Sequence, residues 1–223
     1  LLLFAYLSDK EKFVAFFKDK SSYISLILFA FFGLLLTQLT YLIAIAETNA
    51  GTATVLQYVC PVGVLAYTCI KDRVGPTVSE IASMLLAIGG TFLIATHGQL
   101  NQLAITPKGL GWGLFSAFAY ALYIILPLNL IKKWGSMLVI GVGMLLPGIL
   151  MLPFSGLVSF QGHYSSDNLW ALFGLIVLGT IFAYTVFLKG TSMVGAVKGS
   201  LLASIEPISA VFFAYIIMND QFY

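Results

Sequence analysis

Of the 223 residues, 60% are hydrophobic and only 9% carry a charge, and the mean hydropathy is +0.99. Because a soluble domain carries roughly 25% charged residues, this composition excludes a soluble globular protein and predicts a polytopic membrane protein. The net charge of +2 and the lack of a basic cluster give no support to nucleic-acid binding, so no nucleic-acid partner is expected.

Apolar stretches of about twenty residues, the length that spans a bilayer, alternate with polar segments along the chain. Residues 1–7 are too short to span, and we expect the tail of a helix whose start is missing; residues 8–22 are polar and of mixed charge. Turns are expected at residues 47–51, 71–76 and 132–135. Seven whole transmembrane helices are predicted, over residues 25–46, 52–70, 77–96, 109–131, 136–154, 169–188 and 197–218. The predicted fold class is an all-α polytopic membrane protein.

The basic residues of the loops predict the orientation. If the sides of the membrane alternate, ten of the eleven basic residues fall on one side and only Lys108 falls on the other. By the positive-inside rule, the richer side is the cytoplasm. The ten residues are Lys10, Lys12, Lys18, Lys20, Lys71, Arg73, Lys132, Lys133, Lys189 and Lys198.

Two proline-bearing stretches resemble each other, which predicts two copies of one unit. When Pro61 is laid on Pro207, a shift of 146 positions, the flanking residues also agree, and an upstream group agrees at a shift of 143. Proline-interrupted segments at corresponding places in two halves point to the binding site of a transporter, and both prolines are expected to kink their helices. The matching pairs are Ala50 with Ala196, Thr54 with Ser200, Leu56 with Leu202, Val62 with Ile208, Thr37 with Thr180, and Tyr41 with Tyr184.

Glu206 lies beside Pro207 in the middle of an apolar run. A carboxylate at bilayer depth costs at least ~2.5–3.5 kcal/mol, so such a residue usually faces a water-filled cavity or a partner. Glu206 could bind a cationic substrate or carry a coupling proton. Alternatively, the Glu-Pro pair is a feature of the fold, and the acid caps a helix or accepts a hydrogen bond from a tyrosine.

Polar and aromatic residues recur at helical spacing along several of the predicted spans. With lipid outside, these stripes are expected to turn inward and line a substrate cavity. Alternatively, the hydroxyls bond back to their own helices and the aromatic rings simply pack. The predicted cavity residues are Thr37, Gln38, Tyr41, Thr54, Gln57, Tyr58, Trp112, Ser116, Tyr120, Tyr123, Thr180, Tyr184, Ser200 and Ser204.

Small residues repeat every four positions at Gly109, Gly113, Ala117 and Ala121. Such a ridge lets another helix approach closely, so we interpret it as a packing surface. Cys60 and Cys69 lie nine residues apart on one predicted helix, where they cannot pair and match no metal spacing. His97 and His163 each stand alone in a loop. No metal site, cofactor or catalytic residue is expected.

Several motifs resemble those of the drug/metabolite transporter superfamily, specifically its EamA-type domains. They are residues 46–61 (AETNAGTATVLQYVCP), the turn KDRV at 71–74 with Gly89 and Gly90, and LLASIEP at 201–207 with NDQ at 219–221. The resemblance implies ten helices in two inverted five-helix repeats. Residues 1–98 would form the first repeat, without its first helix and most of its second. Residues 107–223 would form the second repeat, without the tenth helix of the family.

The same resemblance implies a secondary transporter of the bacterial cytoplasmic membrane that moves a small metabolite or amino acid, as an exporter working by alternating access. Its partners would be the small-molecule substrate and the lipid bilayer. The sequence does not decide between a monomer and a homodimer. The alternatives are a membrane-embedded enzyme and a channel or structural membrane protein. The sequence shows no His-Glu-x-x-His run or other clustered catalytic set, which argues against the enzyme.

Overall fold

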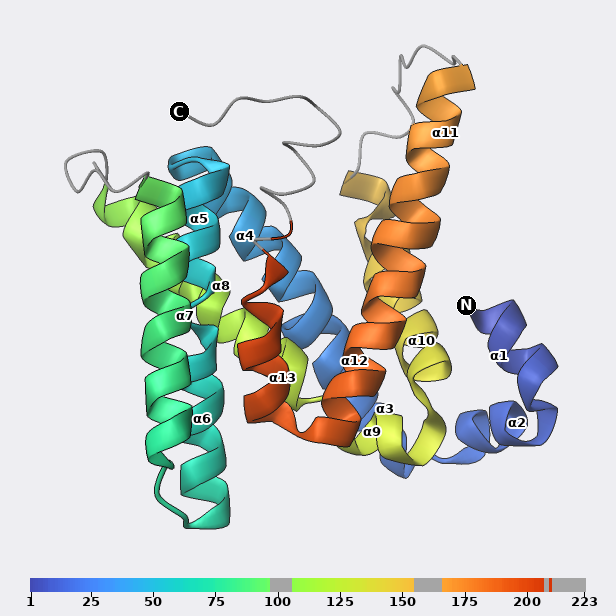
Figure 1. Ribbon diagram of the computed structural model, residues 1–223. Coiled ribbons are helices and arrows are strands. Elements are labelled where there is room, and N and C mark those ends of the chain that lie inside the picture. The colour runs from blue at the N-terminus through green and yellow to red at the C-terminus, as the bar shows by residue number, and fades with distance from the viewer. Residues whose placement is uncertain (97–105, 155–165, 207–208, 210–223) are drawn as a thin grey trace. The chain divides into compact units, whose positions relative to one another are not determined.

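The computed structural model describes residues 1–96, 106–154, 166–206 and 209, and every regular element within these residues is a helix (Figure 1). The chain divides into two compact units. Unit 1 combines Leu1–Leu35 with Leu126–Met193, and unit 2 combines Leu36–Ile125 with Val194–Tyr223. Four helical segments of the described chain are long and apolar enough to cross a membrane: Ser21–Glu47, Ala50–Asp72, Pro107–Trp134 and Asn168–Val194. The predicted class of helical membrane protein is confirmed.

Unit 1 is built around α10, which contacts α1, α3, α9 and the π-helical segment η1. Gly141 and Gly143 allow these approaches, because a Cβ on Gly143 would lie 3.0 Å from the Phe29 ring and one on Gly141 would lie 2.9 Å from Leu2. The elements of unit 1 are α1 (Leu2–Ser8), α2 (Lys10–Lys18), α3 (Ser21–Leu28), η1 (Phe29–Leu35), α9 (Leu128–Trp134), α10 (Ser136–Met151), η3 (Leu152–Phe154), α11 (Ser166–Gly174), η5 (Leu175–Phe182) and α12 (Ala183–Val194).

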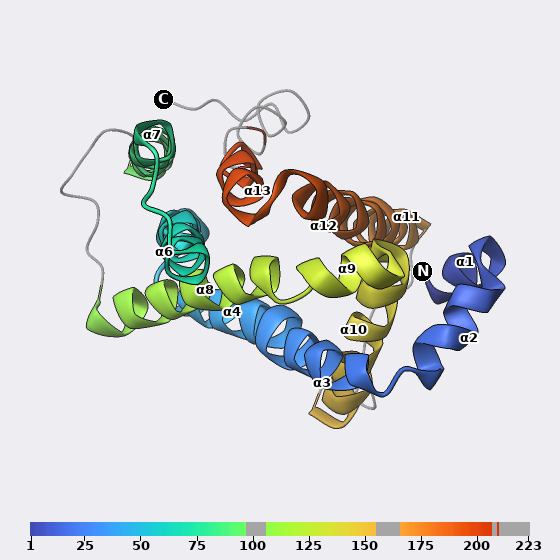
Figure 2. The same ribbon diagram turned by 90° about the horizontal axis from the view of Figure 1, so that it is seen from below.

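Unit 2 is built around α8, which lies along α4 and also contacts α5, α6 and α13 (Figure 2). The small-residue ridge of α8 makes these contacts, as its spacing predicts. Gly109 and Gly113 are buried, and a Cβ at either position would collide with Thr48 or Leu56. The elements of unit 2 are α4 (Leu36–Glu47), α5 (Ala50–Gln57), α6 (Cys60–Asp72), α7 (Val78–Thr96), α8 (Pro107–Ile125) and α13 (Ala196–Ala203).

Two of the three predicted turns are confirmed. Helix α4 ends at Glu47 and α5 begins at Ala50, where the Asn49 side chain accepts a hydrogen bond of 2.8 Å from the Thr52 amide. Helix α6 ends at Asp72 and α7 begins at Val78. Before α7, Thr77 and Glu80 form a reciprocal capping box that satisfies two free amides.

The third turn, predicted at residues 132–135, begins later than predicted. Helix α9 continues through Lys132 and Lys133 to Trp134, and the chain turns only at Gly135, whose φ of +88° suits glycine. The predicted span 169–188 likewise continues to Val194 and turns at Gly195, with φ +94°. Lysines misled both boundaries: Lys132 and Lys133 lie in the last turn of α9, where cations are favoured, and Lys189 lies within α12.

The polar stretch 8–22 contains a helix, α2, which the sequence analysis missed. Asp9 caps its start by accepting a hydrogen bond of 2.9 Å from the Lys12 amide. The helix is amphipathic and buries Phe16, whose ring meets Trp134 edge-on at 5.4 Å between centroids. Burial of one aromatic side chain thus holds a helix together in a sequence rich in lysine.

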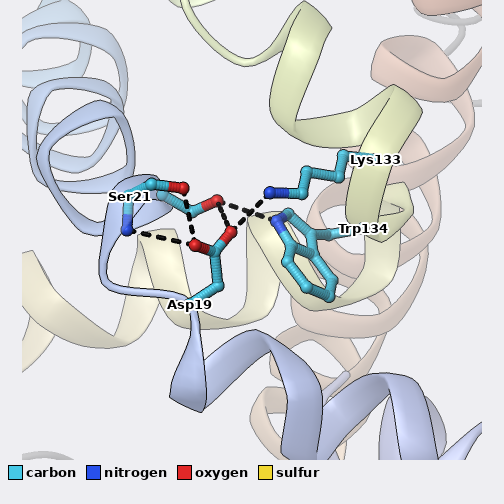
Figure 3. A network of polar contacts seen from close by, with 5 residues as sticks. Asp19, Ser21, Lys133 and Trp134 are labelled. Atoms are coloured by element: carbon cyan, nitrogen blue, oxygen red, sulfur yellow. Dashed lines mark hydrogen bonds and ion pairs between the residues drawn. The ribbon is translucent and has the colours of Figure 1, made fainter.

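A polar network links the end of α2 to the end of α9 within unit 1 (Figure 3). Lys133 Nζ lies 2.5 Å from Asp19 Oδ2, and the Trp134 indole donates to Ser22 Oγ at 2.9 Å. The same carboxylate accepts hydrogen bonds from the hydroxyls of Ser21 and Ser22. The pKa of Asp19 is held well below its usual range, mainly by the bond from Lys133 and next by the hydrogen bonds from Ser21 and Ser22.

The predicted duplication has a parallel in the helix bounds. Shifted by 146 positions, α5 (Ala50–Gln57) falls on α13 (Ala196–Ala203), and in both places two turn residues follow the helix. Pro61 is buried in the first turn of α6, after the break at Tyr58 and Val59, where a proline is well tolerated. The inverted arrangement stays a prediction, and Pro207 and residues 210–218 of the last predicted span lie outside the described residues.

Candidate functional site

The candidate site of unit 2 centres on a bond between two helix breaks. Tyr58 lies in the break between α5 and α6 and is 3% exposed. Its hydroxyl donates a hydrogen bond of 2.8 Å to the Glu206 carboxylate, three residues past the end of α13. Glu206 itself is exposed on this unit. The tyrosine contact that the sequence offered as the alternative for Glu206 is therefore present, and it does not exclude a role in binding.

Gln57, the last residue of α5, extends the site onto α8. Its side-chain amide donates a hydrogen bond of 2.8 Å to Ser116 Oγ, and Ser116 is fully buried. At the end of α5, the neighbouring residues Gln57 and Tyr58 therefore bind different partners: Gln57 binds Ser116 and Tyr58 binds Glu206. Gln57 is half-buried, and this bond satisfies an amide that would cost free energy if it were buried without a partner.

Tyr41 and Thr54 join α4 to α5. Their hydroxyl oxygens are 2.8 Å apart, and Thr54 Oγ1 also lies 2.6 Å from the carbonyl oxygen of Ala50. Because the threonine has one proton and gives it to Ala50, Tyr41 is the donor of the shared bond. The Thr54 hydroxyl therefore donates one hydrogen bond, to Ala50, and accepts one, from Tyr41.

Three aromatic residues of the predicted cavity, Trp112, Tyr120 and Tyr123, lie on α8. The rings of Tyr120 and Tyr123 stack at 5.6 Å between centroids, and Tyr123 is buried. Trp112 is half-buried, with its ring 6.1 Å from that of Phe115. The ring contacts of these three residues agree with the packing interpretation.

The remaining predicted residues of unit 2 differ from one another. Ser200 Oγ donates to the Val197 carbonyl at 2.8 Å within its own helix, as the alternative interpretation expected. Gln38 is exposed. The hydroxyl oxygens of Thr37 and Ser204 are buried and have no hydrogen-bond partner among the described residues. Ser204 lies two residues before Glu206, so a free hydroxyl accompanies the carboxylate.

Thr180 and Tyr184 lie in the other unit, on η5 and α12. Thr180 Oγ1 donates to the Leu175 carbonyl at 3.0 Å, again within its own helix, and Tyr184 is half-buried. Their place in a common cavity stays a prediction.

The sequence analysis missed Thr185 and Thr191 of α12. Both hydroxyls are buried without a partner in the part of the chain that the structure describes. The only signal was a hydroxyl in an apolar helix, and such hydroxyls usually bond to their own backbone. Thr185 also lines a pocket of unit 1 together with lysines of α2, α9 and α12.

The described residues contain no group of three His, Cys, Asp or Glu side chains that could hold a metal ion. Cys60 is buried, Cys69 is half-buried, and both are free thiols. His97 and His163 lie outside the described residues. The chemistry available at the site is thus hydrogen bonding and one carboxylate, which suits reversible binding of a polar or cationic molecule.

The chain matches the family model of EamA-like transporters over residues 1–96 and 107–223. It is 34% identical to YicL of Salmonella typhimurium, named as an uncharacterized inner membrane transporter, over 95% of this chain and 71% of that protein. It is 23% identical to the uncharacterized transporter YcbK of Bacillus subtilis, over 86% of this chain and 63% of that protein. An uncharacterized transporter of Archaeoglobus fulgidus is 22% identical, over 90% of this chain and 70% of that protein.

The chain therefore spans about two thirds of the length of these relatives. No solved structure matches it. The long apolar helices, the match to the family model over nearly all of the chain and the relatives named as transporters agree with one another. The chain belongs to the EamA-like transporter family, and the protein is an integral membrane transporter.

Proposed function

We propose that the protein is a secondary carrier that exports a small metabolite or amino acid across the bacterial cytoplasmic membrane by alternating access. The observation that carries this proposal is the 2.8 Å hydrogen bond from Tyr58 to Glu206, which joins the break after α5 to the end of α13. Helix breaks at corresponding places of two halves are where transporters bind their substrates. The bond links two such places.

Glu206 can exchange one partner for another. Its carboxylate accepts a hydrogen bond from the Tyr58 hydroxyl, and it can equally accept one from the ammonium group of an amino acid or be protonated. Any of these events weakens the tie between the α5 break and α13. Substrate or proton binding would then favour one state of the carrier over another, which is what coupling requires.

The hydroxyl of Ser204, two residues before Glu206, supplies a neutral polar group close to the carboxylate in the sequence. Such groups orient a small polar substrate without charging the site further. Tyr58, Ser204 and Glu206 are the residues that we propose to contact the substrate. Gln57, Ser116, Tyr41 and Thr54 hold the breaks in place through the bonds described above.

The test is flux through the full-length protein in proteoliposomes. A panel of amino acids and small metabolites is followed with and without an imposed pH gradient, for the natural protein, for Glu206→Gln, and for Glu47→Gln as a control that removes an exposed carboxylate at the end of α4. Saturable flux that the gradient drives, and that only Glu206→Gln loses, supports a proton-coupled carrier.

Other outcomes separate the alternatives. Saturable flux that survives Glu206→Gln keeps the carrier and removes Glu206 from coupling. Flux that never saturates, or that appears as conductance, favours a channel. Conversion of a compound without net movement favours a membrane-embedded enzyme, and either of the last two results overturns the proposal.

A further inference from the structure

Unit 1 contains a pocket of about 510 Å³ that none of the residues proposed for transport lines. Its walls come from α1 and α2, from the junction of α9 and α10, and from α12, and all of the lining residues belong to this unit. Three lysines line it: Lys12, Lys132 and Lys189. Asp9 is the one acidic residue of the described lining, so the lining carries an excess of two positive charges.

The three lysines are available to a ligand. The structure records an ion pair for Lys133, which is held by Asp19, but none for Lys12, Lys132 or Lys189 within the described chain. All three belong to the side that the basic residues predict to be cytoplasmic. Like charges gathered around one pocket repel each other unless an anion sits among them, so the pocket favours a negatively charged occupant.

The start of α10 faces the same pocket. Ser136, Met137 and Leu138, the first three residues of this 16-residue helix, all line it. No side chain caps the helix, and first-turn amides have no acceptor within their own helix. Free amides and the positive end of the helix dipole together bind phosphate and other oxyanions.

A buried hydroxyl completes the set. Thr185 of α12 lines the pocket, is 8% exposed, and has a hydroxyl without a hydrogen-bond partner among the described residues. Buried polar groups are nearly always paired, so an unpaired one calls for a partner. A hydroxyl can donate its proton to a phosphate oxygen.

From this juxtaposition we propose that the pocket between α2, the start of α10 and α12 binds a phosphate group at the cytoplasmic face of the membrane. Lys12, Lys132 and Lys189 supply the charge, the α10 amides supply directed donors, and Thr185 donates from the pocket wall. Basic pockets at the cytoplasmic ends of membrane helices suit the headgroups of anionic lipids, and inorganic phosphate offers the same chemistry. The site is independent of the substrate path proposed above.

The test uses the purified full-length protein in detergent, mixed with phosphatidylglycerol and phosphatidylcholine, with retained lipid measured by native mass spectrometry. The variants are Lys132→Gln, Lys189→Gln and Thr185→Val. Lys18→Gln is the matched control, because Lys18 is an exposed lysine of α2 that does not line the pocket. Each pocket lysine is expected to contribute roughly fivefold to phosphatidylglycerol affinity, and the control nothing.

Thr185→Val distinguishes binding from folding. Removing an unpaired buried hydroxyl is expected to raise the midpoint of thermal unfolding without lipid, while weakening phosphatidylglycerol retention. A variant that merely damaged the fold would lower both. A midpoint that Thr185→Val lowers, with unchanged lipid retention, would contradict the proposed role of the hydroxyl.

Inorganic phosphate separates the two sources of the ligand. Phosphatidylglycerol that stays bound against excess inorganic phosphate supports a lipid headgroup, whereas displacement by phosphate that itself raises the unfolding midpoint supports a free anion in the same site. Equal retention of the two lipids with no phosphate effect overturns the proposal. So does a loss in the lysine variants no greater than that in Lys18→Gln.

Discussion

The hydroxyl of Tyr58 donates a hydrogen bond to Glu206 across 148 positions of the chain, and so ties the middle of one apolar helix to the end of another. Tyr58 lies in the break between α5 and α6, and Glu206 follows directly after the two turn residues that end α13. The tie is polar, directed and reversible, unlike the apolar packing that surrounds it.

The energy of this tie is measurable by a double-mutant cycle. Tyr58→Phe and Glu206→Gln, alone and together, are expected to show a coupling in the free energy of unfolding of roughly 0.5–3 kcal/mol, near the lower end because Glu206 is exposed. Denaturant or thermal unfolding in detergent supplies the values. Tyr67→Phe on α6, which has an exposed ring, is the control for loss of a hydroxyl. Strict additivity of the two substitutions would show that the bond contributes nothing.

Gly113→Ala is expected to destabilise unit 2 by about 1–3 kcal/mol, because a Cβ there would lie 2.7 Å from Leu56 Cβ and force α5 away from α8. Gly111→Ala is the matched control on the same helix, since its Cβ would meet nothing within 4 Å. The control should be neutral or slightly stabilising, as alanine favours helices. Equal unfolding midpoints for the two variants would disprove close packing at Gly113.

Acid is expected to weaken unit 1 through Asp19. Its pKa is lowered from 3.8 in the folded protein, so at pH values between the two the unfolded chain binds more protons and stability falls with falling pH. The contribution is fully present above about pH 4 and is lost as the pH drops toward the folded value. Asp19→Asn should flatten this acid limb in thermal unfolding measured against pH, while Glu11→Gln, an exposed carboxylate of α2, should leave it unchanged. An acid limb that persists in Asp19→Asn would refute the assignment.

Asn49→Ala is expected to cost about 1 kcal/mol, because it removes the acceptor that caps the first turn of α5. Asn49→Asp keeps an acceptor oxygen and should retain most of the stability. The unfolding midpoints of the two variants test this directly. Because α5 carries Gln57 and Tyr58 at its end, the alanine variant should also reduce transport more than the aspartate variant does.

Six of the seven predicted spans coincide with helical segments, because hydropathy and length report directly on burial in lipid, and half of the seventh, 197–218, lies outside the described residues. Helix α2 was not predicted because lysines dominate its composition. The contact that stabilises it, between Phe16 and Trp134, joins residues far apart in the chain and is not visible in the local sequence. The turn at residues 132–135 was placed too early for a related reason: Lys132 and Lys133 read as a loop, yet the last turn of a helix accepts them.

For the candidate site, helical spacing predicts which residues share a face but not which neighbour they meet. Gln57 was expected on a polar stripe, but nothing in the sequence pairs it with Ser116. Thr54, Ser200 and Thr180 all donate to carbonyls of their own helices, but Thr54 also accepts a hydrogen bond from Tyr41, which helical spacing alone does not predict. A hydroxyl can satisfy itself locally at no cost, whereas a side-chain amide must find a distant partner.

The break at Tyr58 and Val59 divides one membrane-crossing stretch into two rods that need not move as one. Helix α5 is fastened to α8 by Leu56 over Gly113 and by Gln57 on Ser116. Helix α6 begins after the break with Pro61 in its first turn, and this proline has no amide that could donate a hydrogen bond back across the joint. A movement of α6 would therefore hinge at Tyr58 and Val59 while α5 stays packed on α8. The hydrogen bond from Tyr58 to Glu206 would restrain that movement until it breaks.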